Sequence, residues 1–152
     1  MQAHAIVFQS PQHLSVRGLD LPAPGVGEAE VEVEFSGIST GTERLLWDGS
    51  MPAFPGMGYP LVPGYETVGQ VVKAHEGSKL KEGQTVFVPG ANCFTDDVQG
   101  LFGGASRHLV TAAHRVSRID RGMGAEGALL ALAATARHAL AGFDTALPDL
   151  IV

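Results

Sequence analysis

The chain has 152 residues, of which 45% are hydrophobic and 17% are charged, a profile typical of one folded domain and not of a disordered or fibrous chain. Its formal net charge of −6 argues against a nucleic-acid partner, because phosphate backbones are bound by clustered Lys and Arg. No apolar run approaches the roughly 20 residues of a membrane span, and the N-terminus lacks a signal-peptide pattern, so we expect a cytoplasmic protein.

The first two thirds of the chain predict short strands, consistent with the 20 Gly and nine Pro. Two apolar runs around the turn at residues 10–12 predict a hairpin. In residues 28–36, Val31, Val33 and Phe35 alternate with glutamates, which predicts a strand with one wet face. In chain order we predict strands over residues 3–8, 14–19, 28–36, 67–75, 84–89, 107–111 and 115–119.

Two long segments without periodic pattern, residues 48–64 and 90–106, separate these strands, and such loops are usually functional. An Ala- and Leu-rich stretch predicts a buried helix over residues 124–141, ending at Gly142. Residues 148–152 look like the first residues of a buried strand. We therefore expect an N-terminal fragment of a longer protein.

Thr40, Thr42 and Glu43 lie in the segment that follows the third strand. The spacing of Thr40 and Glu43 is that of a capping box, which predicts a short helix. A hydroxyl from Ser39, Thr40 or Thr42 at this helix start could also pass a proton to or from an alcohol. The two interpretations are compatible.

The run Gly64-Tyr65-Glu66, entering the next strand, completes a pair of motifs. Together the runs GISTGTE and GYETVG resemble the G-I-C-G-T-D and G-H-E-x-x-G motifs of the medium-chain dehydrogenase/reductase superfamily. The resemblance covers essentially the whole chain. It implies a mainly β fold with short helices, a GroES-like partly open barrel over residues 1–122. A connecting helix over 123–147 and the start of a nucleotide-binding Rossmann domain over 148–152 would follow.

By this resemblance, the zinc ligands of the family are missing. The ligand cysteine falls on Ser39 or Thr40 and the ligand histidine on Tyr65, while the third ligand falls within the Ala and Leu residues 131–134. The single Cys93 also cannot build a multi-cysteine zinc site. We therefore predict no bound metal, with Thr42 in the place of the family's proton-relay hydroxyl and Glu66 in that of the carboxylate beside the metal.

Longer runs, at residues 37–47, 52–66, 88–94 and 100–105, resemble a group within this superfamily that oxidises the 3-(1-hydroxyethyl) group of a bacteriochlorophyllide to 3-acetyl. This resemblance implies NAD as the oxidant, held mainly by the second domain, with Thr135 near its nicotinamide. We predict catalytic roles for Thr42, Tyr65, Ser39 and Glu66. A flat macrocycle is best held by aromatic and flexible apolar side chains. The predicted substrate-binding residues are Trp47, Phe54, Met57, Tyr59, Phe94 and Phe102, with Arg44 or Arg107 pairing with a substrate carboxylate.

Two other functions remain open from the sequence. One is a zinc-independent quinone or enoyl reductase of the same superfamily, and the other is a non-enzymatic tetrapyrrole-binding or interaction module. In the dehydrogenase interpretation we expect the fragment alone to be inactive, and any homodimer to form through the second domain.

Overall fold

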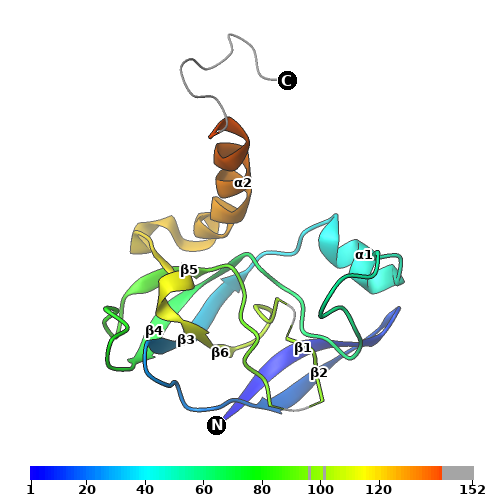
Figure 1. The fold of residues 1–152 in the computed structure, drawn as a ribbon, viewed down its shortest axis with the longest axis horizontal. Helices are drawn as coiled ribbons and strands as arrows, with labels where there is room; N and C mark the ends of the chain where they lie inside the picture. The colour runs from blue at the N-terminus through cyan, green and yellow to red at the C-terminus, as the bar shows by residue number, and fades with distance from the viewer. Residues whose placement is uncertain (96, 101, 142–152) are drawn as a thin grey trace.

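The fold consists mainly of antiparallel strands (Figure 1), as predicted. The computed structural model describes residues 1–95, 97–100 and 102–141. In chain order the elements are β1 Gln2–Ser10, β2 His13–Asp20, β3 Glu28–Ser36, α1 Thr42–Asp48, β4 Thr67–Ala74, β5 Thr85–Val88, β6 His108–Ala112, the 3-10 turn η1 Ala113–Arg115, β7 Ser117–Arg118, the 3-10 segment η2 Arg121–Leu129 and α2 Leu130–Leu140.

The strands form two sheets. β1 and β2 pair as the predicted hairpin, and the other five follow the order β6-β3-β4-β5-β7. Backbone hydrogen bonds join β1 to later loops, since Ile6 N–H donates to Ala105 and Arg107 N–H donates to His4. The hairpin thereby becomes one wall of a partly open barrel. Within the described residues, no helix has the length and apolarity that crossing a membrane requires.

The alternation predicted for β3 holds for most of its length. Val31 and Val33 are buried, while Glu30 and Glu32 face outward and pair with His108 and Arg107 of the neighbouring strand edge. Phe35 departs from the pattern and is 41% exposed. A register shift between Val33 and Phe35 in the pairing with β4 turns Phe35 outward, and such a bulge is not visible in the hydrophobic pattern.

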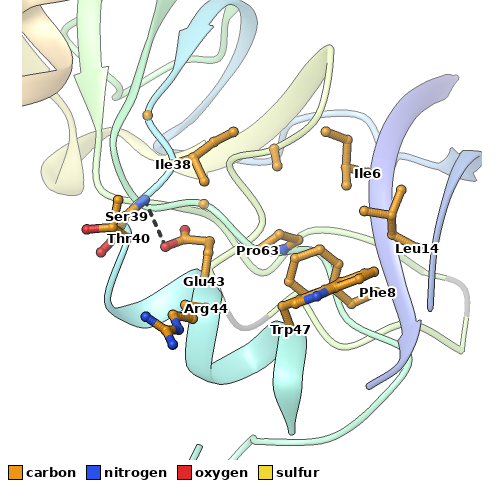
Figure 2. Close-up of a pocket in the computed structure, with 13 residues that line it drawn as sticks. Ile6, Phe8, Leu14, Ile38, Ser39, Thr40, Glu43, Arg44, Trp47 and Pro63 are labelled. Atoms are coloured by element: carbon orange, nitrogen blue, oxygen red, sulfur yellow. Dashed lines mark hydrogen bonds between the residues drawn. The ribbon is translucent and has the colours of Figure 1, made fainter. Parts of the chain in front are cut away.

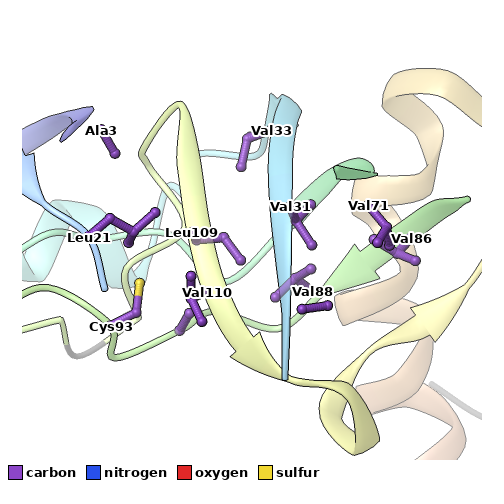
Figure 3. Close-up of a cluster of buried hydrophobic side chains, with 12 residues drawn as sticks. Ala3, Leu21, Val31, Val33, Val71, Val86, Val88, Cys93, Leu109 and Val110 are labelled. Carbon is purple, nitrogen blue, oxygen red and sulfur yellow. The ribbon is translucent and has the colours of Figure 1, made fainter. Parts of the chain in front are cut away.

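The main core lies between the strands of the larger sheet (Figure 3). Most of its aliphatic side chains come from β3, β4, β5 and β6, with Ala3, Leu21 and Ala91 added from elsewhere, and the Cys93 sulfur packs at one edge. The larger fully buried side chains contributed by these strands are Val31, Val71, Val86, Val88 and Leu109. Burying each Val or Leu side chain is worth about 1.5–3 kcal/mol, so this cluster holds the strands together.

The prediction of one buried helix over residues 124–141 is wrong in two respects. The α-helix begins only at Leu130, because the glycine-containing segment before it is 3-10 and Gly124 has a non-helical conformation. None of residues 130–140 is buried, and Leu132 is 57% exposed. Figure 1 shows α2 projecting away from the strands. The apolar composition led to the prediction that this helix is buried. Composition alone does not identify which other segment would cover it. The predicted helix end at Gly142 and the strand at 148–152 lie outside the described residues.

The last predicted strand is also shorter than expected. The range 115–119 contains only the two-residue β7, because the preceding residues form the 3-10 turn η1. The two long segments at 48–64 and 90–106 are irregular over their described residues, as predicted. The second is held by close backbone contacts, since Ala91 N–H donates to Phe102 at 2.6 Å and Gly103 N–H donates to Val62 at 2.9 Å.

Gly103 therefore tests this loop crossing. Its φ is +69°, and a Cβ there would lie 1.8 Å from the Ala91 carbonyl oxygen. Gly83 has a similar φ of +80° but open space around it, so Gly83→Ala measures the backbone strain alone. We expect Gly83→Ala to lower the free energy of unfolding by about 1–2 kcal/mol, and Gly103→Ala to lower it by more than about 3 kcal/mol. Urea denaturation measures both free energies of unfolding. Equal losses in the two variants would contradict the close contact between Gly103 and the Ala91 carbonyl.

Candidate functional site

The two motifs meet because β3 and β4 are paired. Ser36 lies opposite Thr67, so the segments that adjoin these residues leave the sheet side by side. Gly37 N–H donates to the Glu66 carbonyl at 2.8 Å, and a Cβ at Gly37 would lie 2.3 Å from Glu66 Oε2. Glycine at this position allows the Glu66 side chain to cross the first motif.

The cap of α1 differs by one residue from the predicted capping box. Gly41, not Thr40, is the N-cap, and it has no side chain to cap with. Ser39 supplies the missing acceptor, since Thr42 N–H donates to Ser39 Oγ at 3.2 Å and Ser39 N–H donates to Glu43 Oε2 at 3.1 Å. The glycine between Thr40 and Thr42 lengthens the turn, and this shifts the reciprocal pair from Thr40 and Glu43 to Ser39 and Glu43.

Thr42 and Tyr65 form a direct hydroxyl pair between the motifs. Their oxygens lie 3.2 Å apart, and either can donate. The Tyr65 ring packs on Phe102, with ring centroids 5.2 Å apart and planes at 58°. Both hydroxyl-bearing side chains are half-buried, so the pair is held in place but can exchange protons with an incoming alcohol.

Two carboxyl groups lie buried behind this pair. Glu43 is 6% exposed and Glu66 is 7% exposed. Desolvation raises the pKa of Glu43 above its ordinary value, and the negative charge of Glu66 acts in the same direction, against the N–H groups of the local backbone. Glu43 Oε1 is buried without a hydrogen-bond partner.

An apolar cavity of about 550 Å³ opens beside these groups (Figure 2). Its polar end is formed by Ser39, Thr40 and Glu43, with Arg44 on the same helix. Figure 2 shows the aromatic rings of Phe8 and Trp47 together at the opposite end, where they meet edge to face with centroids 5.8 Å apart. The remaining lining residues are Ile6, Leu14, Gly37, Ile38, Pro63, Gly64 and Ala105.

The predicted substrate-binding residues fall into two groups. Trp47 and Arg44 line the cavity, and Phe54 is exposed at 37% without being part of the lining. The others pack against buried clusters: Met57, Tyr59 and Phe102 against the cluster of Phe8, Leu46 and Leu61, and Phe94 against the main core and the cluster of the hairpin. The Tyr59 hydroxyl donates to the Leu46 carbonyl.

Arg107 and Thr135 lie away from the cavity lining. The Arg107 guanidinium pairs with Glu32 at 2.5 Å on the sheet, so between the two predicted arginines it is Arg44 that borders the cavity. Thr135 is exposed on α2 and donates its hydroxyl to the Ala131 carbonyl at 3.0 Å. That bond leaves the lone pairs and methyl group of Thr135 free to meet a cofactor.

The donor set at the positions of the family's ligands does not fit zinc. Zinc takes Cys, His and carboxylate ligands, whereas Ser39, Thr40 and Tyr65 offer only hydroxyls, those of Ser39 and Tyr65 already bonded to Thr42. Residues 131–134 offer no donor side chain. Across residues 1–95, 97–100 and 102–141, no three His, Cys, Asp or Glu side chains group so as to hold a metal ion.

Sequence reasoning missed the contribution of the hairpin and of Glu43. Ile6 and Leu14 line the cavity from β1 and β2. A signal was present, because apolar residues occupy both alternating faces of β1 around Ile6, which is typical of a strand covered on both sides. The place of Glu43 could not be recognised, since its capping partner was assigned to the wrong residue.

Comparison with known proteins agrees with this architecture. A family model described as the alcohol dehydrogenase GroES-like domain matches residues 25–121. The chain belongs to this family. An alcohol dehydrogenase from Escherichia coli CFT073, solved in complex with NADH, superposes with a TM-score of 0.68 at 23% identity, covering 85% of this chain and 42% of that one. At this identity the likeness shows the shared fold of the GroES-like domain.

Two relatives match this GroES-like domain over its whole length. The 2-desacetyl-2-hydroxyethyl bacteriochlorophyllide A dehydrogenases of Rhodobacter capsulatus and Cereibacter sphaeroides are 60% and 56% identical to it. Both matches cover 100% of this chain, but only 48% and 49% of the relatives. The chain thus spans about half the length of these curated relatives.

Cys93 lies outside the site, in the main core, and its chemistry is testable. Burial raises the pKa of its thiol to about 11, with a small contribution in the same direction from Glu28. Because the thiolate is the reactive form, we expect a thiol reagent at pH 8 to leave Cys93 unmodified in the folded protein and to modify it rapidly in denaturant. Mass spectrometry measures the modified fraction. Fast modification of the native protein would contradict the burial.

Proposed function

We propose that this domain is the substrate-facing part of a dehydrogenase that oxidises the 3-(1-hydroxyethyl) group of a bacteriochlorophyllide to 3-acetyl, with NAD as the oxidant and without zinc. The observation that carries the proposal is the 60% identity, over all 152 residues, to a protein named as such a dehydrogenase. The cavity and the hydroxyl pair are compatible with that chemistry.

The hydroxyl pair is suited to remove the carbinol proton. Thr42 Oγ1 takes the proton of the substrate hydroxyl as it passes its own to Tyr65, whose half-exposed side chain returns a proton to water. Ser39 holds the Thr42 backbone in place. A bound nicotinamide supplies the acceptor for the hydride that leaves the carbinol carbon, and Thr135 is the residue of this chain proposed to touch it.

In this proposal, hydrogen bonds instead of a metal ion stabilise the carbinol oxygen of the substrate as negative charge develops on it. The donors available at the junction of the motifs are the hydroxyls of Thr42 and Tyr65. Because the residues at the ligand positions do not fit zinc, we route no step through a metal ion. In this proposal Glu66, buried beside Gly37, is the carboxyl group that borders the relay.

The cavity suits the apolar ring of the proposed substrate. Its volume of about 550 Å³ falls within the range of roughly 300–1,000 Å³ that small-molecule sites occupy. Trp47 offers an aromatic face, and the exposed Arg44 is placed to pair with a substrate carboxylate at the entrance. In this proposal Phe54 extends the apolar surface, while Met57, Tyr59, Phe94 and Phe102 shape the walls from behind.

The proposal predicts substrate choice and metal independence for the full-length enzyme. We expect NAD-dependent turnover of a hydroxyethyl chlorin, unchanged by a chelator, and no stoichiometric zinc by elemental analysis. Turnover of quinones or enones instead would identify a reductase of the same superfamily, and chlorin binding without turnover would identify a binding module. Equimolar zinc that is lost together with activity would contradict the metal-free mechanism.

The hydroxyl pair makes a second prediction in the full-length enzyme. Thr42→Val removes the relay and should lower kcat by on the order of 10²–10³-fold, with little change in KM. Tyr65→Phe should lower kcat less, because Thr42 can still reach water. Since the two groups act as one unit, the double variant should lose less than the sum of the two effects.

Thr95→Val is the matched control for this experiment, because Thr95 is exposed, bonds to the Asp20 carbonyl and belongs neither to the motifs nor to the cavity lining. We expect it to keep wild-type kinetics. Wild-type kcat in Thr42→Val, or strictly additive losses in the double variant, would show that the pair is not the relay.

A further inference from the structure

Glu43 is connected, residue by residue, to both hydroxyl-bearing residues of the proposed relay by three hydrogen bonds. Its Oε2 accepts from Ser39 N–H at 3.1 Å, Ser39 Oγ accepts from Thr42 N–H at 3.2 Å, and Thr42 Oγ1 lies 3.2 Å from the Tyr65 hydroxyl. The contacts thus run from Glu43 in the first motif to Tyr65 in the second, through the backbone and side chains of Ser39 and Thr42.

The second motif also reaches Glu43 from the other side. The backbone of Gly64 and the charge of Glu66 both act on its carboxyl group, in opposite directions. Glu66 is itself buried at the start of β4. Glu43, although part of the first motif, thus faces the second motif as well.

The surroundings of Glu43 favour its neutral form. Oε1 has no hydrogen-bond partner and no access to water, and an ionised oxygen in such a position is costly. The charged neighbours do not compensate: Glu66 is a like charge, and the guanidinium-bearing Arg44 on the same helix is exposed. Desolvation and the like charge both raise the pKa of Glu43, in agreement with this argument from burial.

We propose that Glu43 is a positioning residue of this site: as an uncharged carboxylic acid, it ties the Gly37–Glu43 turn to the Gly64–Glu66 segment and so fixes the Thr42–Tyr65 hydroxyl pair. The group takes over the structural part of the missing metal's role. Its hydrogen bond orders the turn, and its lack of charge lets it lie beside Glu66. The inference deepens the proposed function and rests on it for the kinetic consequence only.

The charge state is tested by the stability of the full-length protein, independently of any activity. A carboxyl group whose pKa is raised in the folded state binds more protons folded than unfolded, so stability falls as pH rises from about 4.3, the value of an unfolded Glu, through the raised pKa. Glu43→Gln cannot ionise, so the variant does not lose this stability as the pH rises. We expect its thermal midpoint to exceed that of wild type at pH 7, and the difference to shrink as pH falls toward about 4.

Glu82→Gln is the control for this measurement, because Glu82 is exposed and the substitution removes the same charge. Its difference from wild type should not depend on pH. A Glu43→Gln midpoint at or below that of wild type at pH 7, or a difference that does not change with pH, would overturn the assignment of an uncharged Glu43.

The positioning role is tested by kinetics with a hydroxyethyl chlorin. Glu43→Ala should lower kcat by on the order of 10²-fold, the cost of a displacement of about 1 Å in a reacting group, while KM stays near the wild-type value. Glu43→Gln should restore most of kcat and should lack the part of the wild-type pH profile that reports ionisation of Glu43. A purely structural Glu43 would leave the shape of that profile unchanged, and this outcome would overturn the role.

The two proposals fail separately. If the enzyme does not turn over the chlorin but Glu43→Gln shows the pH-dependent gain in stability, the uncharged Glu43 stands and the proposed function fails. If turnover is observed while both Glu43 variants match wild type in kcat and pH profile, the function stands and the positioning role fails. Should Glu43→Ala not fold, Glu43→Gln decides.

Discussion

The pairing of β3 with β4 is the constraint from which the site follows. With Ser36 opposite Thr67, the chain leaves β3 and enters β4 at the same place, and the two motifs, although more than twenty residues apart in sequence, become neighbours. The bond from Gly37 N–H to the Glu66 carbonyl extends this pairing by one step into the motifs. The aliphatic core between the strands therefore also sets the separation of the Thr42 and Tyr65 hydroxyls.

The junction of the motifs is built from hydrogen bonds within and between the two segments. The two segments are joined by the bond from Gly37 N–H to the Glu66 carbonyl and by the Thr42–Tyr65 pair, while Ser39 and the buried Glu43 order the first segment by hydrogen bonds within it. Hydrogen bonds are individually weaker than metal–ligand bonds, so the arrangement depends on burial of the groups and on the rigid strand pairing beneath them. The apolar cavity adjoins the polar junction, which suits a large ring that carries one reactive polar group.

The strands and their chain order were predictable because period-two alternation is a local property. The bulge that turns Phe35 outward was not, since it depends on register with β4. For the helices the limit is similar. The Ala- and Leu-rich composition indicates a helix, but glycines delay its start to Leu130, and burial depends on segments that local composition does not identify.

For the site, the sequence was enough to locate the two motifs, and their resemblance to the family motifs directed attention to Thr42 and Tyr65, which the structure brings within 3.2 Å of each other. The sequence could not establish which groups touch. The aromatic residues of the loops were expected to face a ligand, and several of them pack into cores, while Ile6 and Leu14 of the distant hairpin line the cavity. Contacts of this kind join positions far apart in the chain. The capping partner of Glu43 was also not predictable, because the glycine between Thr40 and Thr42 shifts the partner from Thr40 to Ser39. Residue chemistry is encoded locally, but the neighbours that tune it are selected by the folding of the whole domain.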